Sequence, residues 1–131
     1  ARLTALEGAS SGGGSLFAIW AEENAGLGNN TYEWAFGNGA NTPAAGGIVI
    51  PVSCELVAMT AKSNGAATST VQVVINGSPD ASYSVTMGAG IGSNTFGTPL
   101  PIAADTFINF RTLTAGTSTS PNTVCAWFRE V

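Results

Sequence analysis

The chain has 131 residues, which is enough for one domain with a hydrophobic core of its own. Only 9% of its residues are charged and the formal net charge is -4, so its surface must consist mostly of small polar groups or be covered in part by other chains. The basic residues are few and scattered, which argues against nucleic acid as a partner. No apolar run approaches the roughly 20 residues of a membrane-spanning helix, and no secretory signal pattern is present, so we expect no membrane insertion.

The first fifteen residues have the composition of a short amphipathic segment followed by a hinge. Leu3 and Leu6 have the a-to-d spacing of a heptad, with Arg2 and Glu7 at positions where parallel coiled coils form interchain ion pairs. One turn cannot hold a coiled coil alone, so residues 1–7 are either the last turn of a longer stalk or an attachment segment, helical or extended, that docks on a neighbouring surface. Residues 8–15 are rich in Gly and Ser and predict a flexible hinge before a domain at 16–131.

Two stretches early in this domain each carry a tryptophan in a strand-like pattern. Leu16–Ala21 is apolar on both faces, which predicts core on one side and another subunit on the other. Tyr32, Trp34 and Phe36 would share one face of a strand that ends in a glycine turn at 37–39. We interpret this second stretch as a buried strand that joins the core to a subunit interface.

The remainder of the chain reads as short strands separated by turns. Prolines at 99 and 101 demote 95–102 to an edge strand or an extended loop. The other expected strands are 48–50, 54–62, 70–75, 81–87, 106–111 and 123–130. This spacing, without helical periodicity after Glu7, predicts an all-β fold of about eight strands, an antiparallel and jelly-roll-like β-sandwich.

The last strand also indicates how the domain assembles. Alternation places Val124, Ala126 and Phe128 in the core, and Cys125, Trp127 and Arg129 on the opposite face. A tryptophan on that face is either a binding platform or part of a subunit interface, and the second apolar face at Trp20 favours the interface. The predicted interface residues are therefore Leu3, Leu6, Trp20, Trp127 and Arg129.

Residue types that carry chemistry are scarce. The chain has no histidine, so it cannot form a Ser-His-Asp or Cys-His arrangement. Glu22 and Glu23 are adjacent and would face opposite sides of a strand, and nothing in the spacing of Glu33, Glu55 and Asp105 brings them together. No calcium-loop or phosphate-loop pattern occurs. We therefore expect no catalytic residue, no metal site and no cofactor.

The two cysteines, Cys54 and Cys125, both lie in strand-like runs and not in a CxxC pair. They are interpreted either as two small buried hydrophobic residues or as a disulfide.

Six segments of the domain share a pattern with a known group of proteins: 20–25, 33–40, 47–51, 54–59, 97–99 and 104–110. They resemble the C-terminal head domains of tailed-bacteriophage fibre proteins. The similarity covers most of 16–131 as a pattern, and residues 2–7 are similar to the end of the helical repeats of such fibres.

This resemblance implies a homotrimeric jelly-roll knob, of the kind also seen in tumour-necrosis-factor-like domains, on the virion surface. It implies a non-enzymatic role in attachment to the host, with a fibre stalk or capsid as the virion partner. Since rigid scaffolds carry recognition on loops, we expect a host-surface glycan or protein to contact loops whose candidate residues are Asn24, Asn29, Asn30, Asn64, Asn94, Ser118 and Asn122. The alternative is a capsid decoration protein, a cement or head-fibre protein with a structural role.

Overall fold

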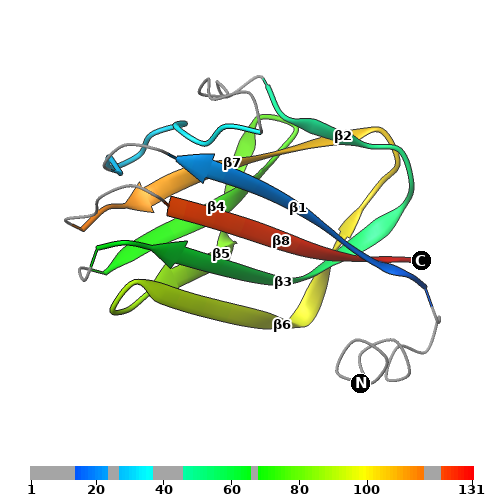
Figure 1. Cartoon of the computed structure of the whole chain (residues 1–131). Coiled ribbons are helices and arrows are strands. Elements are labelled where there is room, and N and C mark those ends of the chain that lie inside the picture. The colour runs from blue at the N-terminus through cyan, green and yellow to red at the C-terminus, as the bar shows by residue number, and fades with distance from the viewer. Residues whose placement is uncertain (1–13, 24–26, 37–45, 66–67, 117–121) are drawn as a thin grey trace.

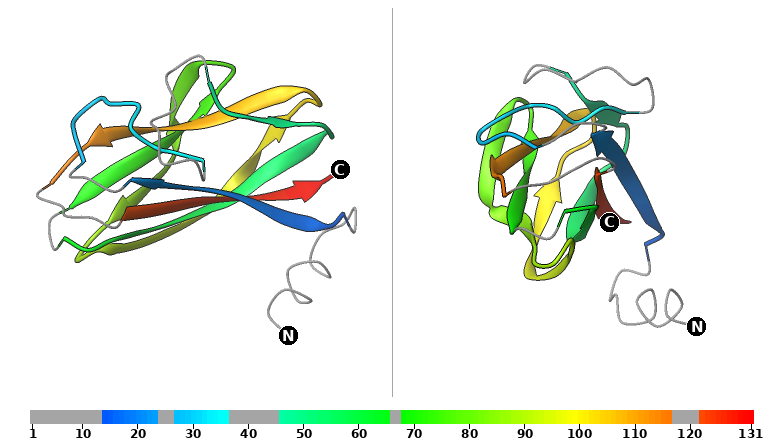
Figure 2. Two further views of the ribbon diagram at one scale, coloured as in Figure 1. Left: turned by 45° about the horizontal axis from the view of Figure 1, so that its top comes forward. Right: turned by 60° about the vertical axis from the view of Figure 1, so that its left-hand side comes forward.

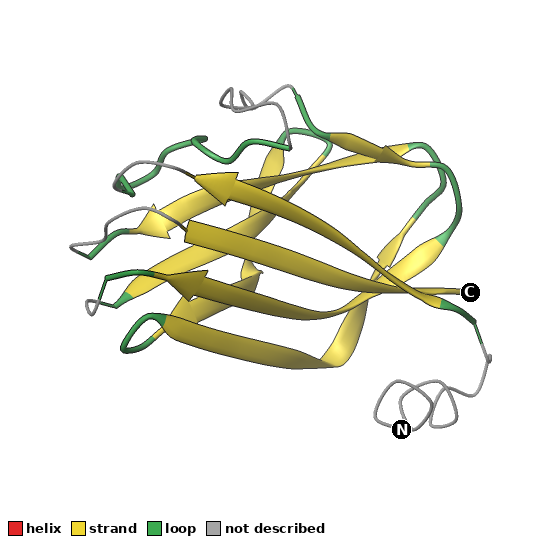
Figure 3. Ribbon diagram, viewed as in Figure 1, coloured by secondary structure: helices red, strands yellow, loops and turns green. Residues whose placement is uncertain are grey.

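A computed structural model of the chain describes residues 14–23, 27–36, 46–65, 68–116 and 122–131. The described residues form strands and connecting turns and contain no helix (Figure 3). The predicted segment at 1–7 and residues 8–13 of the predicted hinge lie outside them. The eight strands are β1 Leu16–Glu23, β2 Ile48–Ile50, β3 Cys54–Ser63, β4 Ser69–Ile75, β5 Ser78–Met87, β6 Ile91–Ile102, β7 Thr106–Thr114 and β8 Asn122–Glu130.

The strands form two four-stranded sheets that pack face to face (Figures 1 and 2). One sheet has the order β1-β8-β3-β6 and the other β2-β7-β4-β5, and every strand pair is antiparallel. The chain passes to the opposite sheet at each connection between consecutive strands except the β4–β5 hairpin. The fold is thus an all-β antiparallel sandwich, as predicted, and this strand order is compatible with a jelly roll.

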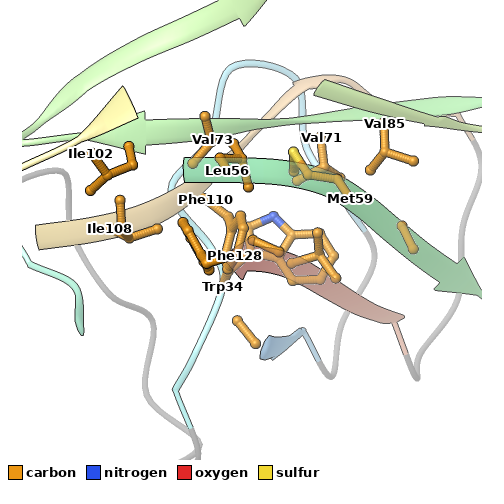
Figure 4. Close-up of a cluster of buried hydrophobic side chains, with 14 of the residues drawn as sticks. Trp34, Leu56, Met59, Val71, Val73, Val85, Ile102, Ile108, Phe110 and Phe128 are labelled. Atoms are coloured by element: carbon orange, nitrogen blue, oxygen red, sulfur yellow. The ribbon is translucent and has the colours of Figure 1, made fainter. Parts of the chain in front are cut away.

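Alternation explains which side chains of β8 face the core. In β8, Val124, Ala126 and Phe128 are fully buried between the sheets, whereas Trp127 is exposed, as its sequence pattern predicts. Phe128 stacks on Phe17 of β1 with ring centroids 5.3 Å apart. Large apolar side chains from both sheets meet in one cluster that the Trp34 indole joins (Figure 4).

Trp34 reaches this cluster from a segment that is not a strand. We define Thr31–Phe36 as the edge strap: it makes isolated bridges only, between Thr31 and Thr112 of β7 and between Ala35 and Glu22 of β1. The prediction of a regular strand with Tyr32, Trp34 and Phe36 on one face is therefore wrong. The strap crosses from one sheet to the other and covers the edge of the sandwich between β1 and β7, and the glycine turn predicted at 37–39 lies outside the described residues.

Strand limits differ from the predictions where glycine, proline or acidic residues suggested a break. β1 extends through Glu22 and Glu23, beyond the predicted stretch Leu16–Ala21, because β8 pairs with the whole of β1. β6 tolerates both prolines because it is an edge strand, one of the two alternatives predicted for this stretch. β5 begins at Ser78, because the tight turn before it needs only Asn76 and Gly77, both with positive φ.

Candidate functional site

The strands β1, β3, β5 and β7 all end on the same side of the sandwich, which we call the distal end and which lies on the left in Figure 1. At the opposite, proximal end the chain enters the domain at residues 14–15 and the C-terminus lies nearby (Figure 1). The loops in which the candidate ligand residues were sought follow these strands and therefore begin at the end farthest from the entry of the chain.

Hydrogen bonds donated by backbone amides hold the described parts of the distal end together. The Ala115 amide donates to Asn29 Oδ1 at 2.6 Å, and the Gly116 amide donates to Ser69 Oγ at 2.9 Å. Ser63 N donates to the Gly90 carbonyl at 2.7 Å, which ties two neighbouring turns. These bonds order the loop bases on the rigid sheets, an arrangement suited to recognition.

The strap contributes an aromatic and cationic contact beside this end. The Arg111 guanidinium lies 5.7 Å from the centre of the Tyr32 ring and donates to Asn30 Oδ1 at 3.0 Å. Glu33 is 9% exposed, and both of its carboxylate oxygens accept the Gly28 amide, at 3.0 and 3.1 Å. Sequence reasoning missed Arg111 and Tyr32 as partners, because they are about eighty positions apart and no local pattern links them.

Not every predicted ligand residue lies at the distal loops. Asn29, Asn30 and Asn64 do, whereas Asn24 and Ser118 fall outside the described residues. Asn94 lies within β6 and Asn122 begins β8, so assigning these two to loops was wrong. Both were misplaced because the loops before them are shorter than their composition suggested. Asn122 is fully buried and its side chain donates to the Glu23 carbonyl at 3.3 Å, so it holds the β1–β8 pair and cannot meet a ligand from solvent.

The predicted interface residues of the domain lie on one surface, the outer face of the β1-β8-β3-β6 sheet. The sheet register aligns its outward side chains in rows across the four strands. The two central rows are Trp20, Cys125, Thr60, Ser93 and Ala18, Trp127, Ala58, Thr95. Neither row contains a charged residue, and Trp20 is 52% and Trp127 37% exposed.

Two contacts fix the geometry of this outer face. Trp127 Nε1 donates to Thr60 Oγ1 at 3.2 Å, which holds the indole across the neighbouring strand. Arg129 Nη2 forms an ion pair with Glu55 Oε2 at 2.6 Å beside the uncharged rows. Leu3 and Leu6, the other predicted interface residues, lie outside the described residues. An uncharged aromatic centre with charges kept to its margin is the composition found in protein interfaces.

The cysteines are free thiols and not a disulfide. Cys54 faces the core at the start of β3, whereas Cys125 lies on the outer face near the middle of β8. Burial raises the pKa of the Cys54 thiol to about 11, and the carboxylates of Glu130 and Glu55 add to this rise. Burial also raises the pKa of the Cys125 thiol, opposed by its hydrogen bond with Thr60. Raised pKa values make both thiols poor nucleophiles at neutral pH.

The carboxylates considered as candidates for chemistry are engaged separately. Glu33 binds the Gly28 amide in the strap, Glu55 pairs with Arg129, and Asp105 occupies the β6–β7 turn with a φ of 64°. Among the described residues, no three acidic, cysteine or histidine side chains are placed to hold a metal ion. That part of the chain also contains no helix able to cross a membrane. The described side chains at the distal end therefore offer hydrogen-bonding groups and aromatic surface, with the Arg111 guanidinium beside them.

No protein-family model matches the chain, and no curated protein matches its sequence. The interpretation of function therefore rests on the surfaces described above.

Proposed function

We propose that this chain forms the homotrimeric knob of a bacteriophage fibre, which binds a glycan or protein of the host surface with its distal loops. In this role the protein is not an enzyme and works on the virion surface. The observation that carries the proposal is that β1, β3, β5 and β7 all end opposite the entry of the chain, so the loops that follow them begin there. A fibre stalk joined to the proximal end would point these loops outward, toward a host.

The outer face of the β1-β8-β3-β6 sheet supports self-association. A monomer would leave two indoles and two uncharged rows of side chains exposed to water. Because only 9% of the residues are charged, few other groups would keep such a surface soluble. Ile48 of β2, 38% exposed, lines a depression together with Ala18 and Trp20 of β1, and the neighbouring Val49 is 57% exposed. Each subunit thus has an apolar face and an apolar edge, and contact between face and edge around a closed axis would bury both.

Threefold repetition would also compensate for weak binding at each site. Distal amide and hydroxyl groups make individually weak hydrogen bonds with a solvated partner. Three copies on one knob raise the effective concentration of the second and third sites once the first is bound.

Assembly is tested by light scattering after size-exclusion chromatography at micromolar concentration. We expect a particle of three times the 13.1 kDa chain mass, and dissociation when Trp127→Asp places a charge in the uncharged rows. Wild-type protein at the monomer mass would overturn the trimer. A trimer that survives Trp127→Asp would mean that the outer face is not the interface.

Recognition is tested with fluorescently labelled protein on a panel of bacterial strains. A Cβ at Gly88 meets no other atom within 4 Å, so Gly88→Lys adds a long side chain to the distal end at little structural cost. Ala103→Lys makes the same charge change at the exposed proximal turn between β6 and β7. We expect Gly88→Lys to weaken cell binding and Ala103→Lys to leave it unchanged; equal effects would contradict recognition by the distal end.

Antibody labelling of intact particles under the electron microscope tests the place of the protein. Label at the fibre tips is the expected result. Label spread over the capsid shell would overturn the fibre-tip proposal in favour of a decoration protein.

A further inference from the structure

Two strand irregularities meet at the sandwich edge formed by β5 and β6. In β5, Ser84 pairs with Gln72 but Asp80 pairs with the next residue of β4, so residues 81–83 have no partner in that ladder. In β6, Leu100 pairs with Leu56 and Thr95 with Ala58, which leaves residues 96–99 without partners in theirs. β5 and β6 belong to different sheets and lie side by side, so the two irregular segments face each other. Bulges of this kind commonly redirect side chains near functional sites.

Specific contacts fix the side chains that these segments present. The rings of Tyr83 and Phe96 pack edge to face, with centroids 4.9 Å apart and planes at 68°. Tyr83 Oη donates to the Thr98 carbonyl at 3.0 Å. Asn94 Nδ2 donates to the Ser84 carbonyl at 2.8 Å, which joins the two sheets across this edge. A site held in this way binds without having to order its side chains first.

These residues enclose a shallow depression of about 270 Å³, which we call the bulge site. Its lining combines two aromatic rings with hydroxyl and amide groups and contains no charged side chain. The lining residues are Ser82, Tyr83, Asn94, Thr95, Phe96, Gly97 and Thr98. Since Asn94 uses its amide nitrogen within the domain, its carbonyl oxygen is the acceptor left for a ligand.

We propose that the bulge site binds one neutral sugar residue of a host-surface glycan, an inference that rests on the proposed function and adds a lateral contact to the distal loops. A sugar ring has an apolar face of C–H groups and a rim of hydroxyls. The aromatic pair offers a surface for that face, and Asn94, Ser82 and Thr95 offer acceptors and donors for the rim. In other binding surfaces, Tyr supplies a rigid aromatic contact while Asn and Ser supply adaptable hydrogen bonds.

Size and charge select this ligand class. Sites for drug-sized ligands span roughly 300–1,000 Å³, so the bulge site suits about one ring of a longer chain. A charged sugar would find no ion-pair partner in the lining, whereas a neutral sugar leaves no charge unpaired. A single ring held this way binds weakly, and three bulge sites on one knob would add by avidity.

The test is a titration followed by amide NMR of the assembled protein. The probes are methyl glucoside, methyl galactoside and N-acetylglucosamine at millimolar concentration, with N-acetylneuraminic acid as the charged comparison. We expect at least one neutral sugar to shift the amide resonances of residues 82–84 and 94–98, and the acidic sugar to shift these resonances far less. Phe96→Leu keeps an apolar side chain in the core but removes the ring, and should abolish these shifts.

A matched pair of lysine substitutions locates the binding. A Cβ at Gly97, like one at Gly88, meets no other atom within 4 Å. We expect Gly97→Lys to abolish the shifts caused by the neutral sugar and Gly88→Lys to leave them unchanged. If Gly97→Lys titrates like the wild type, or if the acidic sugar binds equally well, the bulge site does not bind neutral sugar and the inference fails.

Failure of the bulge site can be told apart from failure of the proposed function. Shifts confined to the distal turns and lost in Gly88→Lys would refute the bulge site while keeping glycan recognition by the loops. If no sugar causes shifts but Gly88→Lys still weakens cell binding, the bulge site is refuted while recognition by the distal end stands. Shifts between 94 and 98 in a protein that is monomeric would support the bulge site and overturn the trimeric knob.

Discussion

Replacing Trp34 with alanine should destabilise the domain more than any other single change in the edge strap. Its indole is fully buried between the sheets, and its Nε1 donates to Thr112 Oγ1 at 3.1 Å. Truncating a buried tryptophan costs roughly 3–5 kcal/mol, and this change also leaves the Thr112 hydroxyl without its donor. Since domains of this kind have a free energy of unfolding of about 5–15 kcal/mol, Trp34→Ala should remove roughly a fifth of it or more.

The measurement is urea unfolding followed by far-UV circular dichroism. Trp34→Phe keeps most of the buried ring but loses the hydrogen bond and leaves a smaller void, so we expect a loss of about 1–2 kcal/mol. Trp20→Ala is the control of the same residue type, because Trp20 is 52% exposed. Its effect should depend on protein concentration, through assembly, whereas the effect of Trp34→Ala should not.

Two results would refute the packing argument for the strap. A loss below about 1 kcal/mol for Trp34→Ala would mean that the strap is not part of the core. Equal losses for Trp34→Ala and Trp34→Phe would mean that the hydrogen bond, and not the buried ring, carries the contribution.

Three further changes test other parts of the fold. Ala89 has a φ of 54°, so Ala89→Gly should raise the free energy of unfolding by about 0.5–1 kcal/mol. Gly90→Ala should lower it, because a Cβ there would lie 2.7 Å from the Ser63 carbonyl oxygen. Chemical denaturation checks both changes, and a gain in stability for Gly90→Ala would contradict this geometry. Burial raises the pKa of Cys54 to about 11, so the folded state holds this proton more tightly than the unfolded state does. The free energy of unfolding should therefore fall as pH rises from about 9 to 11, and it should fall less in Cys54→Ala. Equal falls in the two proteins would contradict the raised pKa. Glu55→Gln breaks a partly exposed ion pair and should lower the free energy of unfolding by no more than about 1 kcal/mol, and by less in high salt. A loss of stability that does not change with salt would mean that the contribution of this pair is not electrostatic.

Strand faces were predictable from the sequence where one side of a strand is buried. The alternation in β8 assigned Phe128 to the core and Trp127 to the outer face, and both assignments are confirmed. A period of two needs only local information, because successive side chains of a strand point to opposite sides. The same information could not reveal that the outer side chains of four strands form two uncharged rows, because that depends on the register among β1, β8, β3 and β6.

The edge strap shows where alternation misleads. Tyr32, Trp34 and Phe36 have the pattern of a strand, but no neighbouring strand pairs with the segment along its length. Trp34 is buried because it fills the gap between the sheets, and Tyr32 lies against Arg111 instead of sharing that environment. A segment that crosses a sandwich edge therefore gives the same sequence signal as a strand within a sheet.

The sequence contained only part of the information needed to predict the bulge site. Pro99 and Pro101 predicted an edge strand or an extended loop at 95–102, and β6 is an edge strand whose register with β3 shifts between Thr95 and Leu100. Nothing in the sequence linked this irregularity to the one before Ser84, because β5 and β6 meet there only after the chain has crossed between the sheets.

By itself, then, the sequence determined the all-β class, most strand positions, the inward side of β8 and the shortage of groups for catalysis, because composition and a two-residue period are local properties. Tertiary structure alone decided which loops share the distal end, which rows form the outer face, that Asn94 and Asn122 belong to strands, and that Tyr83 meets Phe96. These features depend on strand order and register: β1 pairs with β8 from the far end of the chain, and each later connection but one changes sheets. Such pairings are fixed by how the whole core packs, and no short window of sequence contains them.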